Sequence, residues 1–436
     1  MTIEHHPATY PSRFSADPAG GAVRLADALS AAGDRTRPLG TSSMTTDARA
    51  ARMRELVQLV APALRASRAT SEAARRLAPE AMDALIDAGI LRALVPAVYH
   101  GSELGPVSGV QLFEELATVD SAAAWVGAIS AAAAWLLALL PSQAADEMLA
   151  DPRSVVNGTL FPPLTAESVP GGYRVSGRSS FASGCNYATW LQCQAVVFEH
   201  GAPVIGPNGN PRAVLVHVPA TEAEIIDTWH TLGMRGTGSN DFRTTDVFVP
   251  EHRAWPMGPM APLNPAFTDA LTRMGVWWFS PLVASVSLGI ARAAIADLIE
   301  LAQHKTPSYT HVGLADKPVV QDKLARARAA VDAARSYLYG ALAAAEETVR
   351  TQPRLSLEQG MPLALAGSHA VEAATQAVDL VHSCVGTSGI RNEQPFQQYL
   401  RDVHTISQHA FASASRFESV GKLMLGRESD WPFYAL

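Results

Sequence analysis

Two histidines near the C-terminus are the side chains best suited to acid–base chemistry. His404 and His409 lie five residues apart in the segment RDVHTISQHAF. An imidazole with an ordinary pKa of about 6.5 can orient or deprotonate a phenol, an amine or a thiol near neutral pH. A lone histidine on a helix is more often structural, so residue type alone leaves both roles open.

Two glycine-rich stretches could hold an anionic group or could simply form turns. The first is GTGSN at residues 236–240, and the second is VGTSG at residues 385–389. Glycines allow a phosphate to approach backbone N–H groups closely. The first stretch lacks both the G-x-G-x-x-G and the Walker spacing. The second, taken alone, is typical of an ordinary turn.

Composition and charge exclude several classes of function. The chain of 436 residues is 48% hydrophobic and 17% charged, with a net charge of −7, which gives no basic surface for nucleic acid. Its three cysteines, Cys185, Cys193 and Cys384, show neither C-x-x-C nor Cys/His metal spacing, so no metal site or disulfide framework is expected. The N-terminal residues do not resemble a signal peptide, and the cytoplasm is the expected compartment.

The elements that must position these residues follow from hydrophobic periodicity. We expect a flexible N-terminal extension at 1–45 and a helical domain at 46–150, where Leu56, Val60 and Leu64 share one helix face. Short runs of Val, Phe and Tyr between Gly, Pro and Asn predict a β-domain at 151–260. Four long Ala/Leu-rich segments then predict a four-helix bundle at 261–436, with helices at 282–303, 319–350, 362–384 and 395–425.

One stretch is long and apolar enough to be tested as a membrane span. Residues 121–140 contain no charged side chain. Their first half is mostly Ala, Ser and Gly, and they lack flanking Lys/Arg and an aromatic belt at both ends. A helix buried on all sides inside the protein is therefore expected, and no membrane association.

Three longer stretches of the chain resemble the acyl-CoA dehydrogenase superfamily. They are GGYRVSGRSSFASGCNYATW at 171–190, DTWHTLGMRGTGSNDFRTTDVFVP at 227–250 and SCVGTSGIRNEQPFQQYLRDVHTISQHAF at 383–411, and the similarity extends over residues 47–436. It implies a mostly α fold with a small β-domain: an N-terminal helical domain, a middle β-barrel-like domain and a C-terminal four-helix bundle. It also implies a homotetramer in which a neighbouring subunit completes each cofactor site.

The resemblance further implies a flavin site. Ser183 falls at the hydroxyl position that meets the flavin ring, where N5 and O4 need hydrogen-bond partners, and Phe181 falls at an aromatic position that can cover a ring face. Thr159 matches a hydroxyl near the flavin pyrimidine. Lys305, beside His304, stands where the family places an Arg, although solvated surface charges are an equal alternative for both. The glycine segment expected at the flavin phosphate comprises Gly386, Thr387, Ser388 and Gly389.

The same resemblance assigns substrate contacts to the long apolar helix and to the loop that contains GTGSN. In its GTGS form this loop is similar to the oxygenase branch of the superfamily. The residues concerned are Trp135, Trp229, Thr237, Ser239 and Asn240.

The family positions of a catalytic carboxylate are empty in this chain. Dehydrogenases most often place a Glu nine residues after the Arg of the Arg-Asp pair, and that position here is Ala410. The alternative position lies at the start of the bundle, where MGVWWFSPLV at residues 274–283 contains no Asp or Glu. Flavin monooxygenases on this fold instead carry a His eight residues after the Arg, which is His409.

The chain departs from the aromatic hydroxylases of that branch at one position. They usually carry a second His just before a Trp, whereas Ala133 and Ala134 precede Trp135 here. If that His helps to bind or ionise a phenol, its loss argues against a simple phenol as substrate. Amines, sulfur compounds, indoles and larger intermediates remain open.

The function that these residues favour is a monooxygenase. We expect reduced flavin, FMNH2 or FADH2, to react with O2 through a C4a-hydroperoxide and to hydroxylate or oxidise a small organic molecule. The chain has no nicotinamide fingerprint, which implies a separate NAD(P)H-dependent flavin reductase. The alternatives are an acyl-CoA dehydrogenase or oxidase with a relocated base, such as Asp241 or Glu393, and a non-catalytic small-molecule-binding protein.

Overall fold

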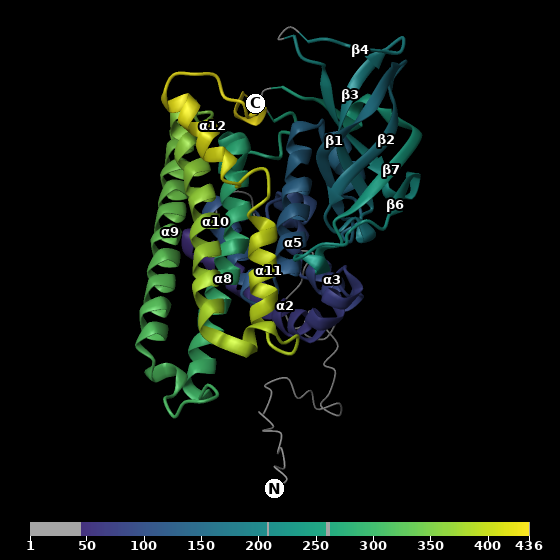
Figure 1. The fold of residues 1–436 in the computed structure, drawn as a ribbon. Coiled ribbons are helices and arrows are strands. Elements are labelled where there is room, and N and C mark those ends of the chain that lie inside the picture. The colour runs from purple at the N-terminus through teal and green to yellow at the C-terminus, as the bar shows by residue number, and fades with distance from the viewer. Residues whose placement is uncertain (1–44, 207–208, 259–261, 436) are drawn as a thin grey trace. The chain divides into compact units, whose positions relative to one another are not determined.

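The computed structural model describes residues 45–206, 209–258 and 262–435. The flexible extension expected at residues 1–45 lies outside the described residues, apart from Thr45. Helices come first along the chain, then strands, then helices again (Figure 1). The predicted fold class is therefore confirmed.

The first part of the chain is helical. Thr45 caps its first helix, because its hydroxyl accepts a hydrogen bond from Ala48 N at 3.2 Å. Two stretches of the described chain, Ser121–Leu139 and Ala270–His304, are long and apolar enough to cross a membrane, but they are 94% and 78% buried inside the protein. The helices of this part are α2 (Thr46–Ala74), α3 (Pro79–Asp87), α4 (Pro106–Ala117), α5 (Ser121–Trp135) and α6 (Ser142–Met148).

The middle strands form one sheet in the order β6-β7-β2-β1-β3-β5-β8, with β4 paired to β3. Only β1 and β3 pair in parallel among the described strands. Alternate side chains such as Leu191, Cys193 and Phe242 are buried in its core. The strands are β1 (Val156–Val169), β2 (Gly172–Ala182), β3 (Trp190–Glu199), β4 (Ala202–Pro203), β5 (Ala213–Pro219), β6 (Ala223–Ile226), β7 (Asn240–Pro250) and β8 (Ala254–Pro256).

The last part is a helical bundle, in which α8, α9, α10 and α11 run side by side (Figure 1). Its helices are α7 (Ala270–Met274), α8 (Phe279–His304), α9 (Pro318–Thr351), α10 (Leu357–Val385), α11 (Phe396–Ile406) and α12 (Ser415–Met424). The single helix expected at 395–425 is wrong, because the chain turns between α11 and α12. There Ser407 Oγ donates to the His404 carbonyl at 2.7 Å, and His409 N donates to the Ile406 carbonyl at 2.8 Å, which tightens the last turn of α11.

A buried carboxylate joins the first part of the chain to the bundle. Glu114, on α4, has no exposed surface. It accepts hydrogen bonds from Arg292 Nη1 on α8 at 2.8 Å, from Arg335 Nε on α9 at 2.6 Å, and from the Tyr339 hydroxyl. Two guanidinium groups and a hydroxyl thus compensate the desolvation of one carboxylate, which fixes where α4 lies against both helices.

Candidate active site

His409 lies in the turn after α11 and is half-buried. Its Nδ1 accepts a long hydrogen bond of 3.4 Å from Phe411 N, and this contact selects the tautomer whose proton is on Nε2. No hydrogen bond to Nε2 is made by the described residues. Burial lowers the pKa of His409 to about 4, so the imidazole is neutral at pH 7. The site therefore offers one free N–H donor.

A chain of hydroxyls begins beside that imidazole. The Trp125 indole, on α5, meets the His409 ring edge to face, with 5.1 Å between ring centroids. Trp125 Nε1 donates to Ser183 Oγ at 3.0 Å, Ser183 Oγ lies 2.7 Å from Ser239 Oγ, and Ser239 Oγ lies 2.7 Å from Thr237 Oγ1. Thr237 Oγ1 in turn donates to the Met234 carbonyl at 2.8 Å. Three of the residues predicted from sequence are thus in direct contact, and Trp125 is one that sequence reasoning missed.

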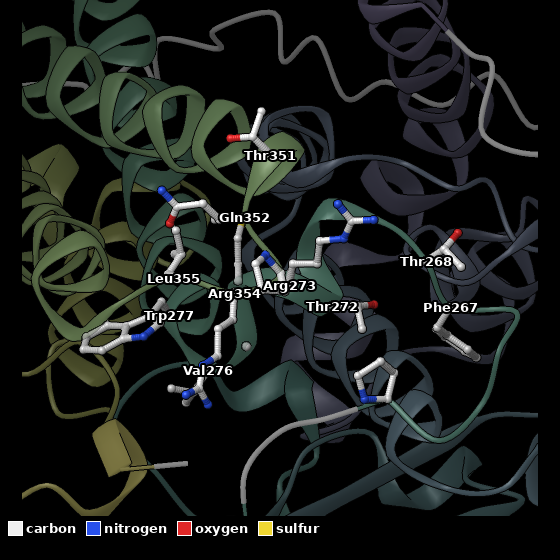
Figure 2. A pocket seen from close by; sticks show the side chains of 14 residues that line it. Phe267, Thr268, Thr272, Arg273, Val276, Trp277, Thr351, Gln352, Arg354 and Leu355 are labelled. Carbon is white, nitrogen blue, oxygen red and sulfur yellow. The ribbon is translucent and has the colours of Figure 1, made fainter.

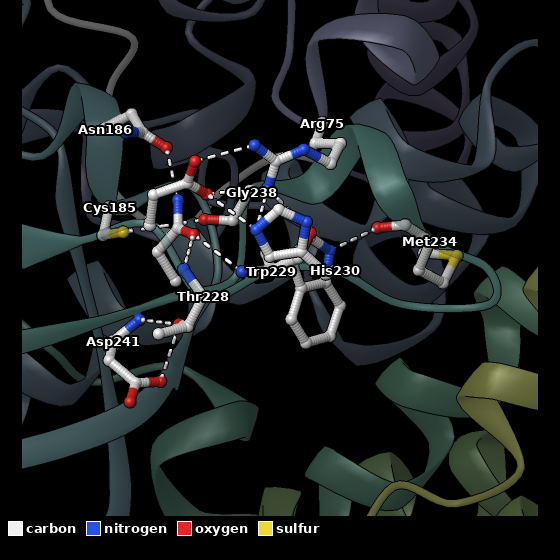
Figure 3. Close-up of polar contacts among 11 residues, drawn as sticks. Arg75, Cys185, Asn186, Thr228, Trp229, His230, Met234, Gly238 and Asp241 are labelled. Carbon is white, nitrogen blue, oxygen red and sulfur yellow. Dashed lines mark hydrogen bonds and ion pairs between the residues drawn. The ribbon is translucent and has the colours of Figure 1, made fainter.

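The loop between β6 and β7 is braced by polar side chains of neighbouring segments (Figure 3). The Asn240 side chain accepts from the backbone N of Thr228 and of Trp229, both at 3.0 Å, and donates to Asn186 Oδ1 at 3.1 Å. Arg75 forms two hydrogen bonds of 2.7 Å with Asp227. Asn240 therefore supports the loop in this structure, and its contact with substrate stays a prediction.

A second brace fixes the loop to the bundle. The Met234 N–H donates to Asp402 Oδ1 at 2.5 Å, and Ser121 Oγ donates to Asp402 Oδ2 at 2.5 Å. Asp402 is on α11 and only 1% exposed. Burial raises its pKa to about 6, although the Ser121 and Met234 hydrogen bonds act in the opposite direction. One carboxylate thus joins α11, the start of α5 and the loop.

An exposed ring, Phe181, and a half-buried ring, Trp229, lie beside the hydroxyl chain. Phe181 itself has a left-handed backbone conformation, with φ of 65°, and is 66% exposed. It meets the Trp229 ring edge to face at 6.2 Å. Trp229 Nε1 donates to the Met234 carbonyl at 2.9 Å, which fixes that indole. Phe181 therefore exposes a large apolar ring to solvent at the end of β2, as expected of a residue that covers a planar cofactor.

Thr159 and Trp135 lie apart from this chain. The Thr159 hydroxyl interacts with its own strand, at 3.2 Å from the Phe161 carbonyl and 3.3 Å from Phe161 N. Trp135 has no exposed surface, and its ring contacts Trp278 at 5.0 Å and Phe279 at 6.1 Å. Because Trp135 is fully buried, direct contact with a substrate would require neighbouring side chains to move.

Four aromatic side chains, Phe279, Phe411, Trp431 and Phe433, form an aromatic wall that reaches His409. Phe411 is its centre and lies 5.4 Å from Phe279, 5.3 Å from Trp431, 5.2 Å from Phe433 and 6.1 Å from His409, measured between ring centroids. Sequence reasoning missed this wall, although the runs WWF at 277–279 and WPF at 431–433 mark two of its parts. The wall presents planar apolar surface to whatever His409 contacts.

The residues predicted to bind phosphate also come together. Lys305 Nζ donates to the Val385 carbonyl at 2.6 Å and to Ser388 Oγ at 2.7 Å. Gly386 has a φ of 57° and begins the short helix Gly386–Ile390, which contains Thr387, Ser388 and Gly389. Burial lowers the pKa of Lys305, with a further contribution from Arg391. A cation and the exposed backbone of Gly386 and Thr387 therefore lie at one end of the bundle.

The ring cluster and the phosphate cluster lie at opposite ends of α8. Phe279 begins this helix of 26 residues and touches Phe411, whereas Lys305 follows its last residue. A helix of that length spans ~39 Å, which exceeds an extended FAD molecule. Within one chain, Lys305 therefore lies at the end of α8 that is far from Phe279.

Neither alternative carboxylate is placed to act as a base beside His409. Asp241 pairs with Arg178 Nη2 at 2.6 Å and accepts from Thr228 Oγ1 at 3.0 Å. Glu393 lies on the surface near the start of α11, and Ala410 is exposed. Across the part of the chain that the structure describes, no group of three His, Cys, Asp or Glu side chains could hold a metal ion.

A cavity of about 790 Å³ lies elsewhere, between α7, the short helix Gly275–Trp278 and the end of α9 (Figure 2). Phe267, Thr272, Arg273, Trp277 and Arg354 are among its lining residues. None of the residues predicted from sequence lines it. The candidate site is therefore the surface around His409, Trp125 and Ser183, and not this cavity.

Comparisons with known proteins identify similar chains. Residues 46–149 match the family model of the acyl-CoA dehydrogenase N-terminal domain, and residues 282–414 match that of the C-terminal domain. An indole-3-acetate monooxygenase of Pseudomonas putida is 30% identical over 81% of this chain and 88% of its own length. The oxygenase component of an FADH2-dependent resorcinol hydroxylase from Rhizobium is 29% identical over 85% and 93%. The structure of XiaF from Streptomyces with FADH2 and glycerol has a TM-score of 0.80 at 25% identity over 88% and 98%.

Proposed function

The chain belongs to the acyl-CoA dehydrogenase superfamily, in its two-component flavin-dependent monooxygenase branch, and we propose that His409, Trp125 and Ser183 form its active site. The protein is a monooxygenase that uses O2 and reduced flavin from a separate reductase to hydroxylate or oxidise a small organic molecule. Bound reduced flavin supplies the electrons for activation of O2. The assignment of the site rests on the contact of His409 with Trp125, whose indole N–H is hydrogen-bonded to Ser183 Oγ.

The described residues fit such a cofactor. Ser183 Oγ keeps an unused lone pair, and the exposed Phe181 ring can cover a flavin face. His409 presents Nε2–H, so we assign it the role of a hydrogen-bond donor that orients the substrate or the reacting oxygen. The aromatic wall holds a planar substrate and excludes water. Thr159 stays a candidate for the pyrimidine edge of the ring.

The substrate is, we propose, a planar aromatic or heteroaromatic compound that does not need a second imidazole. Ala133 and Ala134 are each only 2% exposed, so a larger side chain at either position would require the surrounding residues to repack. Among the described residues, no carboxylate pairs with the neutral His409 to strengthen it as a base. Phenols that must be ionised by two histidines fit this surface less well than indoles, amines or sulfur compounds.

Self-association explains the separation of the two clusters. We propose a homotetramer in which Lys305 and residues 386–389 of one subunit contact the flavin phosphate held at the ring cluster of a neighbour, because Phe279 and Lys305 lie at opposite ends of α8 within a chain. We also place the protein in the cytoplasm, where the three free cysteines of the described chain stay reduced. Light scattering of the purified protein and cell fractionation test these two points.

The decisive experiment mixes O2 with the protein after anaerobic addition of FMNH2 or FADH2. We expect oxidised-flavin absorbance to return only after a delay, because the closed site slows loss of activated oxygen as hydrogen peroxide. His409→Ala should lower product formed per flavin oxidised by roughly 100-fold, the size of a typical acid–base or donor effect. His409→Gln, which keeps an N–H donor, should retain more.

His404→Ala is the matched control, because His404 Nε2 contacts only Asp379 at 2.9 Å on the surface side of α11. It should behave like the unchanged protein. Immediate return of oxidised flavin without product, despite bound flavin, would contradict the assignment of this site.

A further inference from the structure

The hydroxyl chain beside His409 has two ends that can each act in one way only. Trp125 Nε1–H is a donor with no acceptor capacity, and the Met234 carbonyl is an acceptor with no proton. Between them lie Ser183, Ser239 and Thr237, each with one hydroxyl proton. The direction of every bond in the chain follows from these ends.

The proton of Thr237 is used on the Met234 carbonyl, 2.8 Å away. Ser239 must then donate to Thr237, and Ser183 must donate to Ser239. Ser183 Oγ accepts from Trp125 and has no proton left to give. It keeps a single lone pair, so toward a ligand it is an acceptor only.

Burial prevents an easy reversal of this direction. Ser183, Ser239 and Thr237 are 5%, 4% and 1% exposed, so water cannot readily replace one of their partners. The terminal acceptor is also strongly held. The Met234 carbonyl accepts from Thr237 N at 3.1 Å and from Trp229 Nε1 as well as from Thr237 Oγ1, while its own N–H donates to Asp402. Reversing the direction of the chain would break the hydrogen bond from Thr237 Oγ1 to this carbonyl.

We propose that Ser239 and Thr237 make the site selective for the redox state of the flavin by forcing Ser183 to be an acceptor. This inference rests on the proposed function, which places Ser183 at flavin N5. Reduced flavin carries a hydrogen on N5 and can donate to Ser183, whereas N5 of oxidised flavin has a lone pair. In oxidised flavin the N5 lone pair therefore faces the lone pair of Ser183 Oγ and repels it. The site releases oxidised flavin after turnover.

The inference gives Ser239 and Thr237 a role different from the substrate contact expected from sequence. Their hydroxyls are consumed within the chain and present no free proton to a substrate. They are positioning residues, because they act on the cofactor through Ser183. Sequence reasoning could identify Ser183, but the partners of its hydroxyl come from two other segments.

The test compares dissociation constants for reduced and oxidised FMN under anaerobic conditions. The dissociation constant of the unchanged protein should be at least tenfold lower for reduced than for oxidised FMN. This ratio corresponds to one hydrogen bond gained from N5–H to Ser183 and one lone-pair repulsion avoided. Ser239→Ala frees the Ser183 proton directly. Thr237→Val frees it by letting Ser239 turn toward Ser183. Both should lower the preference by roughly tenfold, chiefly through tighter binding of oxidised FMN.

Two further variants are controls. Thr237→Ser keeps a hydroxyl at the same place and should keep the preference. Thr231→Val removes a hydroxyl of the same loop that donates to the Gly233 carbonyl at 2.9 Å outside the chain, and it should also leave the preference unchanged. A preference that is equal in all five proteins overturns the inference.

A probe that needs no variant guards against misfolding. Oxidised 5-deaza-FMN carries C–H in place of N5, so it lacks the opposing lone pair. The unchanged protein should bind it more tightly than oxidised FMN, and equal binding overturns the inference. Failure to bind any flavin would instead overturn the proposed function, which separates the two.

Discussion

The His409 imidazole is kept neutral by burial and not by a partner. Its pKa falls to about 4, and no carboxylate of the described residues pairs with it. An unfolded His has a pKa near 6.5, so protonation favours the unfolded chain. The stability that this residue contributes is complete above pH 6.5 and is lost as the pH falls toward 4.

This lowered pKa predicts the pH dependence of activity. We expect the acid limb of kcat/KM to fall near pH 4 and not near 6.5, because His409 must stay neutral to keep its tautomer. The measurement is product formation with reduced flavin between pH 4 and 8, with His404→Ala measured alongside. A limb near 6.5 that His409→Gln abolishes would show that burial does not set this pKa.

Asp402 acts on three elements at once, since it connects α11, the start of α5 and the loop before β7. Burial raises its pKa from 3.8 to about 6, with Glu72 acting in the same direction and Arg401 in the opposite one. A raised carboxyl pKa favours the folded protonated form. Its contribution to stability is complete below pH 3.8 and is lost as the pH rises through 6.

Asp402→Asn tests this linkage. The free energy of unfolding of the unchanged protein, relative to the variant, should rise by about 2 kcal/mol between pH 7 and pH 4, as follows from a shift of about two pKa units that is nearly complete at pH 4. Urea titrations at several pH values measure it. A difference that does not change with pH would mean that Asp402 titrates normally in the folded protein.

The crossing of α4 and α8 depends on one glycine. A Cβ at Gly289 would lie 2.2 Å from the Glu114 carbonyl oxygen and 2.5 Å from Ala117 Cβ. Gly289→Ala should therefore destabilise the protein by about 3 kcal/mol, because backbone must move. Gly340, on the exposed side of α9, has open space around it, and Gly340→Ala should stabilise by about 1 kcal/mol. Chemical denaturation compares both, and equal effects would contradict this packing.

At the level of the assembly, two defective subunits should complement each other. If a flavin bridges subunits, a mixture of His409→Ala and Lys305→Met chains forms some sites with an intact ring side and an intact phosphate side. Random mixing would restore about a quarter of the activity, since each side is intact in half of the chains. Activity after refolding the variants together and apart is the measurement. No recovery in verified mixed tetramers would show that each site lies within one chain.

Local pattern was enough to predict the class of fold and the order of its parts. The alternation of apolar and polar residues at 151–260 and the helical periodicity after residue 274 indicate which faces are buried. Both patterns can be read from neighbouring residues in the sequence. Longer stretches identified the family and the positions of Ser183 and His409. Local pattern failed at the break after Ile406, where side-chain hydrogen bonds and a docked Phe411 outweigh helix propensity.

The contacts of the site could not be predicted from the chain alone. Trp125 lies 58 residues from Ser183, and Ser183 lies 56 from Ser239, so no periodicity records that their polar atoms meet. The buried position of Trp135 and the placement of Phe279 and Lys305 at opposite ends of α8 likewise depend on how helices pack. Residue types set what each group can donate or accept. Folding alone determines which groups meet, because such contacts form between segments that are distant in sequence.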